Sequence, residues 1–317
     1  MKTLLAAVLL ALPLAGPLRA QTGYENWFTD TEELDRNWVE VHEDARLPQH
    51  KRRFCAVHAS NSVARELRDH LLFGSLAFEN PPGSFNTGLC WFHSRYQRAA
   101  SYLANFRPDL PRPTRERGAE LALRIMDRSA VVEIPGFNNL REFSEEYRQE
   151  ITGLLDRMGV GCFLNPMDCA QRLGDTYDPT PEDMATMMRS LYEQMFHQPG
   201  EIQFLRTRAD MFQSGISRTF GAHSLLVLEM APLRDKGAPH APGMPAAPTG
   251  YTLLTIDPNF PNDRVVLVYR FGDRRLTWQN SLMTYTLAPY RHYEYMGDIN
   301  DFDRAARAYC RPDRRAR

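Results

Sequence analysis

Cys90 stands where loop-forming residues give way to a helical pattern, within the sequence TGLCWFH at positions 87–93. A helix over 87–106 would carry its apolar residues on one stripe, at Phe92, Tyr96, Ala99, Leu103 and Phe106. Cys90 falls on the opposite side with Ser94, Gln97 and Ser101, so we expect it to face a cleft or solvent. The unpaired N–H groups and the dipole of a first helical turn lower the pKa of a thiol. This position favours a nucleophilic thiolate, and the alternative is a disulfide partner or an inert thiol.

A nucleophilic cysteine needs a base, which is usually a histidine. His93 lies on the same predicted helix as Cys90, about one turn along, which is an unfavourable place for the base. His223 opens the strand pattern HSLLVLEM directly after a glycine and an alanine, and these small neighbours let the ring approach a facing helix end. We therefore predict that His223 is the general base.

Asp257 is the candidate for the group that orients His223. If segments 223–230 and 251–257 form an antiparallel hairpin, the start of the first lies opposite the end of the second. Asp257 would then accept a hydrogen bond from the imidazole and stabilise its protonated form. The alternative is an ordinary turn residue, because DPNFPND is rich in turn formers, and Asn259 is the second candidate for the orienting group.

Taken together, these residues resemble the papain-like cysteine peptidase superfamily. A cysteine that opens a helix precedes a tryptophan, a histidine opens a strand, and DPN ends the adjacent strand. The histidine and DPN portion is similar to the bacteriocin-processing branches, where the orienting group is aspartate. The resemblance covers positions 87–106 and 223–271, and it implies that Cys90 is the nucleophile, His223 the general base and Asp257 the orienter.

The papain pattern also has a glutamine several residues before the cysteine, which donates to the oxyanion. Here the corresponding stretch is GSFNTGLC, which contains no glutamine. Asn86, four residues before the sulfur, is the candidate replacement.

The first twenty residues have the layout of a secretory signal peptide, with Lys2, an apolar run over 4–14 and small residues ending at Ala20. We expect a mature chain of residues 21–317 that is periplasmic or secreted. No later stretch approaches the roughly 18 apolar residues of a membrane span. Without Lys2 and Arg19 the chain keeps 36 basic and 39 acidic residues, a balance that gives no reason to expect a nucleic-acid partner.

Five cysteines follow the predicted signal peptide, at Cys55, Cys90, Cys162, Cys169 and Cys310. In an oxidising compartment an odd number leaves one thiol over, and we expect this to be Cys90. Three connectivities are open for the other four, and we expect Cys162 to pair with Cys169 and Cys55 with Cys310. The sequence has no CxxC, HExxH or Gly-rich phosphate motif, so we expect disulfides instead of a zinc site, and no cofactor.

The order of elements predicts an α+β fold of papain-like type, with helices first and an antiparallel meander sheet second. We expect helices over 51–73, 87–106, 114–128, 139–158 and 181–197, and strands over 130–134, 223–230, 251–257 and 264–271. A long exposed loop over 231–250 would connect two of the strands. Residues 21–317 would form a single domain, or two lobes that are mostly helical over 21–200 and mostly strand over 201–317.

Three functions are compatible with this reading. The first is a thiol hydrolase that cleaves an amide or peptide bond in a peptide or protein substrate. The second uses the same three residues to transfer the acyl group to an amine, as transglutaminase-like folds do. The third is an exported binding protein that keeps the fold without the activity.

Overall fold

The computed structural model describes residues 49–84, 89–164, 179–198, 200–213, 216–234, 247–278, 283–287 and 293–311. All of them belong to one compact unit, Asp44–Arg317. The predicted signal peptide, Asn86 and Cys169 lie outside the described residues, as does the side chain of Cys162. The predictions that concern them therefore stay predictions.

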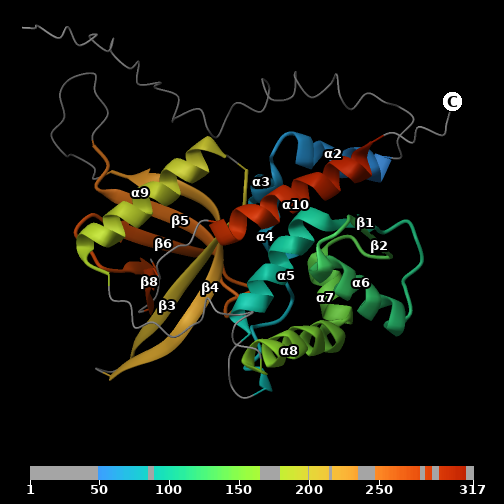
Figure 1. Cartoon of the computed structure of the whole chain (residues 1–317), viewed down its shortest axis with the longest axis horizontal. Coiled ribbons are helices and arrows are strands. Elements are labelled where there is room, and N and C mark those ends of the chain that lie inside the picture. Colours follow the sequence, from blue (N-terminus) through green and yellow to red (C-terminus); the bar gives the residue numbers. More distant parts are fainter. Residues whose placement is uncertain are drawn as a thin grey trace, which may run out of the picture. The chain divides into compact units, whose positions relative to one another are not determined.

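The helices among these residues are α2 (Gln49–Ala59), α3 (Val63–Asp69), α4 (Leu71–Gly74), α5 (Cys90–Leu103), α6 (Arg115–Asp127), α7 (Leu140–Glu146), α8 (Arg148–Leu164), α9 (Pro181–His197) and α10 (Tyr293–Cys310). Figure 1 shows α5 at the centre, with α10 passing over it beside α2. No helix in the described part of the chain is both long and apolar enough to cross a bilayer.

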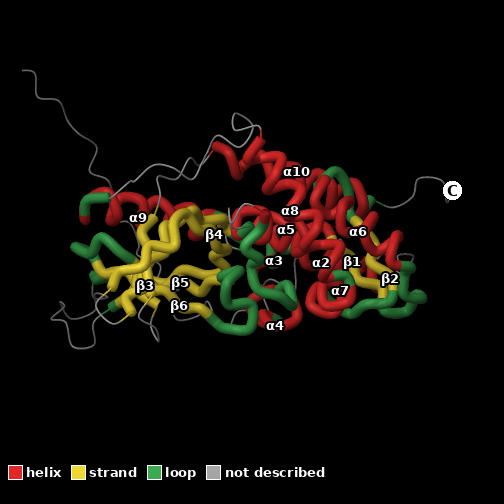
Figure 2. The backbone as a smooth tube through the Cα atoms, turned by 90° about the horizontal axis from the view of Figure 1, so that it is seen from below, coloured by secondary structure: helices red, strands yellow, loops and turns green. Residues whose placement is uncertain are grey.

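Two sheets accompany the helices. A short parallel pair is formed by β1 (Ala104–Arg107) and β2 (Val132–Pro135). Six antiparallel strands form a closed barrel in sequence order: β3 (Gln203–Gln213), β4 (Ile216–Leu233), β5 (Gly250–Ile256), β6 (Val265–Arg270), β7 (Leu276–Trp278) and β8 (Met283–Leu287). Figure 2 shows β3, β5 and β6 away from α5 to α8, whereas β4 reaches the helical part and packs against α5. The α+β class is confirmed, and the predicted meander closes because β8 pairs with β3.

Local signals decide where several helices begin and end. Thr180 caps α9, because its hydroxyl accepts from the Asp183 N–H at 3.1 Å and the Asp183 carboxylate accepts from the Thr180 N–H at 3.1 Å. This helix has the predicted bounds. The predicted helix over 139–158 is divided at Tyr147, whose backbone is not helical. The predicted helix over 51–73 is broken into α2, α3 and α4, and Asn61 between the first two has a positive φ of 49°.

No sequence pattern above predicts β3, β7, β8 or α10. Charged residues interrupt the apolar residues of β3, so its sequence has no simple alternation. The same applies to the first half of β4, which begins at Ile216 and not at His223. The prediction that His223 opens a strand is therefore wrong, and His223 lies within β4.

Alternate residues of the barrel strands pack into two hydrophobic clusters. Leu226 of β4 and Ile256 of β5 belong to a cluster with helices α5, α6 and α8. Their neighbours Leu225 and Val227 belong to a second cluster, with Met188 of α9. Because side chains alternate across a strand, the barrel presents one face to the helical part and the other to its own interior and α9.

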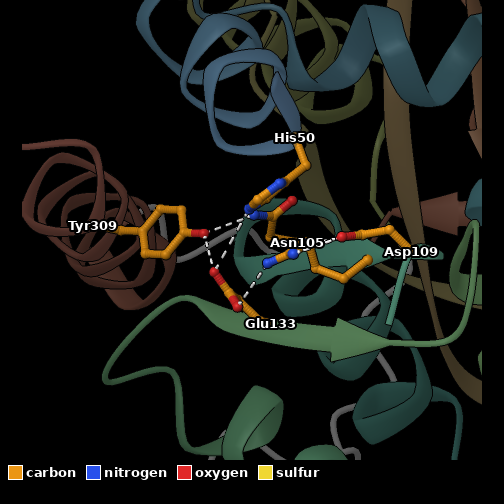
Figure 3. A network of polar contacts seen from close by, with 6 residues as sticks. His50, Asn105, Asp109, Glu133 and Tyr309 are labelled. Carbon is orange, nitrogen blue, oxygen red and sulfur yellow. Dashed lines mark hydrogen bonds and ion pairs between the residues drawn. The ribbon is translucent and has the colours of Figure 1, made fainter. Parts of the chain in front are cut away.

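The C-terminal helix α10 is fixed to the start of the described chain. The disulfide Cys55–Cys310 joins it to α2 with a Cα–Cα distance of 5.6 Å, which confirms that predicted pairing. Figure 3 shows a polar network that includes Tyr309, the residue before Cys310. The Tyr309 hydroxyl donates to Glu133 of β2 at 2.6 Å and accepts from the Asn105 amide of β1 at 2.8 Å.

Candidate active site

Cys90 is the first residue of α5, so its sulfur lies at the helix N-terminus, as predicted. The first helical hydrogen bond runs from the His93 N–H to the Leu89 carbonyl at 2.8 Å, and the preceding N–H groups lie outside the intrahelical ladder. The incoming loop is anchored at Ser84, whose backbone N–H donates to Asp156 of α8 at 2.6 Å. The chain is therefore fixed to α8 at Ser84, six residues before Cys90.

The expectation that Cys90 faces a cleft or solvent is wrong in this structure. Its exposure is 7 %, and Ser94 and Gln97 on the same side of α5 are each 1 % exposed. The reason is that β4 packs against α5. The Ser94 hydroxyl donates to the Ser224 carbonyl of β4 at 3.2 Å, so the polar side of the helix is used to dock the strand that carries His223.

His223 and Asp257 form a direct hydrogen bond. The distance between Nε2 of His223 and Oδ1 of Asp257 is 2.8 Å, and both side chains are almost fully buried. The predicted contact is therefore present, but the two residues are not opposite each other in the ladder. The β4–β5 ladder ends at the Leu226–Ile256 pair, and Asp257 follows the end of β5, so its side chain reaches back diagonally.

A turn after β5 fixes the carboxylate of Asp257. Its Oδ1 also accepts from the backbone N–H of Asn259 at 2.9 Å, and its carbonyl accepts from the Phe260 N–H at 2.9 Å. Asp257 is thus both a turn residue and the partner of His223. The side chain of Asn259 instead accepts from the Asn80 amide at 3.3 Å. These contacts favour Asp257 over Asn259 as the orienting group.

The charges of these groups depend on one another. Burial lowers the pKa of His223, but the negative charge of Asp257 and its hydrogen bond outweigh this and raise the pKa to about 10. Burial raises the pKa of Cys90, but a hydrogen bond to His223, the charge of His223 and contacts with Ser224 bring it below its ordinary value. The two opposite shifts favour a thiolate beside an imidazolium.

His93, three residues after Cys90 on α5, is fully buried. Its Nε2 is 3.1 Å from the Phe78 carbonyl, and burial lowers its pKa to about 4. It is therefore neutral near pH 7, and no contact with the Cys90 sulfur is among its interactions. This agrees with the low rank given to His93 as the base.

Ser224, Phe78 and Asn80 also surround these residues, and no local pattern in the sequence marks them. Each meets the site through a contact between distant parts of the chain. The one usable signal is Ser94, which lies one helical turn after Cys90 on the same side of α5.

A hollow of about 360 Å³ has Phe78 in its wall, but Cys90, His223 and Asp257 are not among its lining residues. One wall comes from residues 77–79 and Pro81, and another from Pro261 and Asn262, which follow Asp257 in the chain. Arg148 of α8 also lines it, with its guanidinium carbon 5.7 Å from the centre of the Phe78 ring. Apolar, polar and charged groups therefore meet in one open depression.

Comparison of the chain with protein-family models, curated proteins and solved structures finds no match. Within the described residues, no group of three or more histidine, cysteine or acidic side chains is placed to hold a metal ion. What the arrangement can do chemically follows from its geometry, which joins a thiol at a helix start to an imidazole and a buried carboxylate.

Proposed function

We propose that this chain is a thiol hydrolase that cleaves an amide or peptide bond and has a papain-like arrangement of its catalytic residues. The observation that carries the proposal is the ordered series Cys90, His223 and Asp257, in which Cys90 opens α5 and His223 bonds to Asp257 at 2.8 Å. Each group supplies what the next one needs. The carboxylate stabilises the imidazolium, and the imidazolium stabilises the thiolate.

The reaction begins from the thiolate form of Cys90. The sulfur attacks the substrate carbonyl carbon, a C–S bond forms, and the carbonyl π electrons move to oxygen. When the tetrahedral intermediate collapses, the C–N bond breaks and the His223 imidazolium gives its proton to the leaving amine. Neutral His223 then removes a proton from water, which attacks the thioester. Cleavage of the C–S bond releases the acid and restores the thiolate and imidazolium.

Because Nε2 of His223 is bonded to Asp257, we assign the proton transfers to Nδ1. Asp257 keeps its hydrogen bond throughout and is not itself protonated. Backbone N–H groups at the start of α5 are the proposed donors to the oxyanion, because they point along the helix axis toward a charge at that end. Asn86 remains the proposed side-chain donor from outside the described residues.

A second function uses the same acyl-enzyme but gives the acyl group to an amine. The three residues perform the first half of both reactions, and the acceptor decides the product. A non-catalytic binding protein is the third candidate. The buried pair of a Cys90 thiolate and a His223 imidazolium favours the two enzymatic functions, because a non-catalytic binding site does not require a cysteine of lowered pKa.

We also propose that the protein works in an oxidising compartment, either the periplasm or the medium. The disulfide between α2 and α10 supports this, because such bonds persist mainly in exported proteins. The predicted signal peptide points in the same direction.

The deciding experiment is active-site labelling followed by product analysis. The chain is treated with iodoacetamide or a peptide acyloxymethyl ketone, and the modified residue is mapped by mass spectrometry. We expect modification of Cys90 that is abolished in Cys90→Ala. Incubation with a peptide mixture and a fluorescent primary amine then separates hydrolysis from transfer. Absence of both labelling and turnover in the folded protein would leave the binding protein as the surviving function.

A further inference from the structure

His93 makes one hydrogen bond and leaves one buried ring nitrogen without a partner. Nε2 lies 3.1 Å from the Phe78 carbonyl, whereas Nδ1 is buried with no hydrogen-bond partner. A carbonyl oxygen only accepts, so Nε2 must carry the proton and donate it. His93 is therefore held in one tautomer, with Nδ1 as a buried acceptor. Such an arrangement is unfavourable by itself, which suggests that its one bond has a specific role.

The Phe78 carbonyl belongs to a segment that also holds the turn carrying Asp257. Two residues later, the backbone N–H of Asn80 donates to the Pro258 carbonyl at 2.7 Å. The Asn80 side-chain amide donates to Oδ1 of Asn259 at 3.3 Å. Both bonds end on the two residues that directly follow Asp257.

These contacts make a continuous path from the helix of the nucleophile to the orienting carboxylate. It runs from His93 on α5 through Phe78 and Asn80 to the turn at residues 258–259, whose Asn259 N–H donates to Asp257 at 2.9 Å. Asp257 in turn bonds to His223. Ser94, the next residue of α5, docks β4 independently at 3.2 Å. Helix α5 thus contacts both the strand of the base and the turn of the orienter.

We propose that His93 is a positioning residue, which uses its Nε2–H bond to Phe78 to hold the turn at residues 257–259 so that Asp257 faces His223. Its effect on Cys90 rests on the proposed function, whereas its effect on His223 does not. Neutral His93 suits this role, because a second imidazolium close to His223 would oppose the charge that Asp257 stabilises.

The test follows the ring of His223 directly. The protein is labelled with ¹⁵N-histidine, and the pH titration of His223 is recorded by NMR together with the alkylation rate of Cys90 at pH 6. His93→Phe fills the space without donating a hydrogen bond. We expect it to lower the apparent pKa of His223 and to slow alkylation by tenfold or more. The side-chain amide of His93→Gln can donate to the Phe78 carbonyl. This variant should restore the pKa of His223 and bring the alkylation rate of Cys90 to within about twofold of wild type.

Tyr96→Phe is the matched control on the same helix. Tyr96 is fully buried and its hydroxyl has no hydrogen-bond partner in the structure, so removal of the hydroxyl should change neither measurement. If His93→Phe does not fold, Asn80→Ala decides, because it removes only the side-chain bond to Asn259. We expect Asn80→Ala to lower the apparent pKa of His223 and to slow the alkylation of Cys90 at least twofold.

A His223 titration in His93→Phe that matches Tyr96→Phe overturns the proposal, and so does an unchanged titration in Asn80→Ala when His93→Phe is unfolded. If wild-type Cys90 neither reacts quickly nor turns over substrate, the proposed function fails. The titration of His223 still answers the question about His93 in that case.

Discussion

At the scale of single residues, the central question is whether the proton lies on Cys90 or on His223. Burial of either group alone would favour its neutral form, because a charge loses solvation in the interior. Asp257 changes this balance by placing a third, negative charge against the imidazole at 2.8 Å. A thiolate and an imidazolium then sit together with a carboxylate behind them, so removal of any one member should change the state of the others.

The first prediction concerns the pH dependence of Cys90. The reactive form is the thiolate, which is populated above the pKa of the thiol, and that pKa is below its ordinary value because of His223. The alkylation rate should therefore reach its plateau at a lower pH than for a free thiol. In His223→Ala the midpoint should move up to or above the ordinary value near 8.5, with a rate at pH 6.5 lower by about tenfold or more. Stopped-flow iodoacetamide kinetics measure this. An unchanged midpoint would exclude His223 as the partner.

The second prediction separates Asp257 from Asn259. Asp257→Asn keeps the shape but removes the negative charge, so the pKa of His223 should fall and Cys90 should alkylate more slowly near pH 6.5. The loss should be smaller than in His223→Ala, since the imidazole remains. Asn259→Ala keeps the backbone N–H that Asp257 accepts and loses only the side-chain bond from Asn80, so its effect should be no larger than the roughly twofold change expected of Asn80→Ala, and smaller than that of Asp257→Asn. The reverse ranking would make Asn259 the orienter.

At the scale of elements, helix starts with a complete local signal were predictable, whereas strands without an alternating pattern were not. Thr180, Pro181 and Asp183 lie next to one another, so α9 could be placed from sequence. Strand β3 could not, because its place depends on pairing with β4 and β8 and not on its own alternation. Likewise, the Ser94–Ser224 and Asn80–Asn259 contacts join residues that no local pattern relates. The sequence identified the three principal site residues, but it did not predict that their side chains would be buried.

The third prediction tests the cap of α9. Thr180→Ala removes the hydroxyl that accepts from the Asp183 N–H, and it should lower the free energy of unfolding by about 1 kcal/mol. Thr186→Ala is the control within the same helix. Its hydroxyl donates to the Glu182 carbonyl at 2.8 Å, and alanine has the higher helix propensity, so the change should be neutral or slightly stabilising. Urea unfolding of the two variants gives the comparison, and equal effects would contradict the assignment of the cap.

For the molecule as a whole, the bond between Cys55 and Cys310 closes a loop with a sequence separation of 255 residues. This bond restricts the unfolded chain more than the folded one. The separate network at Tyr309 holds the same end of α10 through Glu133 and Asn105, so the helix should stay docked when the disulfide is absent.

The fourth prediction follows from that loop. Replacing both cysteines, as Cys55→Ala with Cys310→Ala, should lower the free energy of unfolding by about 3–5 kcal/mol while the far-ultraviolet circular dichroism stays that of the native fold. Denaturant unfolding under non-oxidising conditions provides the measurement. A stability equal to that of the oxidised wild type would show that the bond contributes little. Loss of native helix content would show that the Tyr309 network alone cannot hold α10.

The closure of the barrel limits how a polypeptide can be recognised. Among the described residues, every strand from β3 to β8 has two hydrogen-bonded neighbours, so no strand is unpaired along one whole side. The pairing is incomplete along β4, which pairs with β3 over residues 216–227 but with β5 only over residues 226–233. A peptide substrate of the proposed hydrolase can therefore add to this sheet as a further strand, a common way of binding extended chains, only along such stretches. Elsewhere its backbone must be held by the connections between elements and by the start of α5, and the same closure reduces strand-to-strand association between copies of the protein.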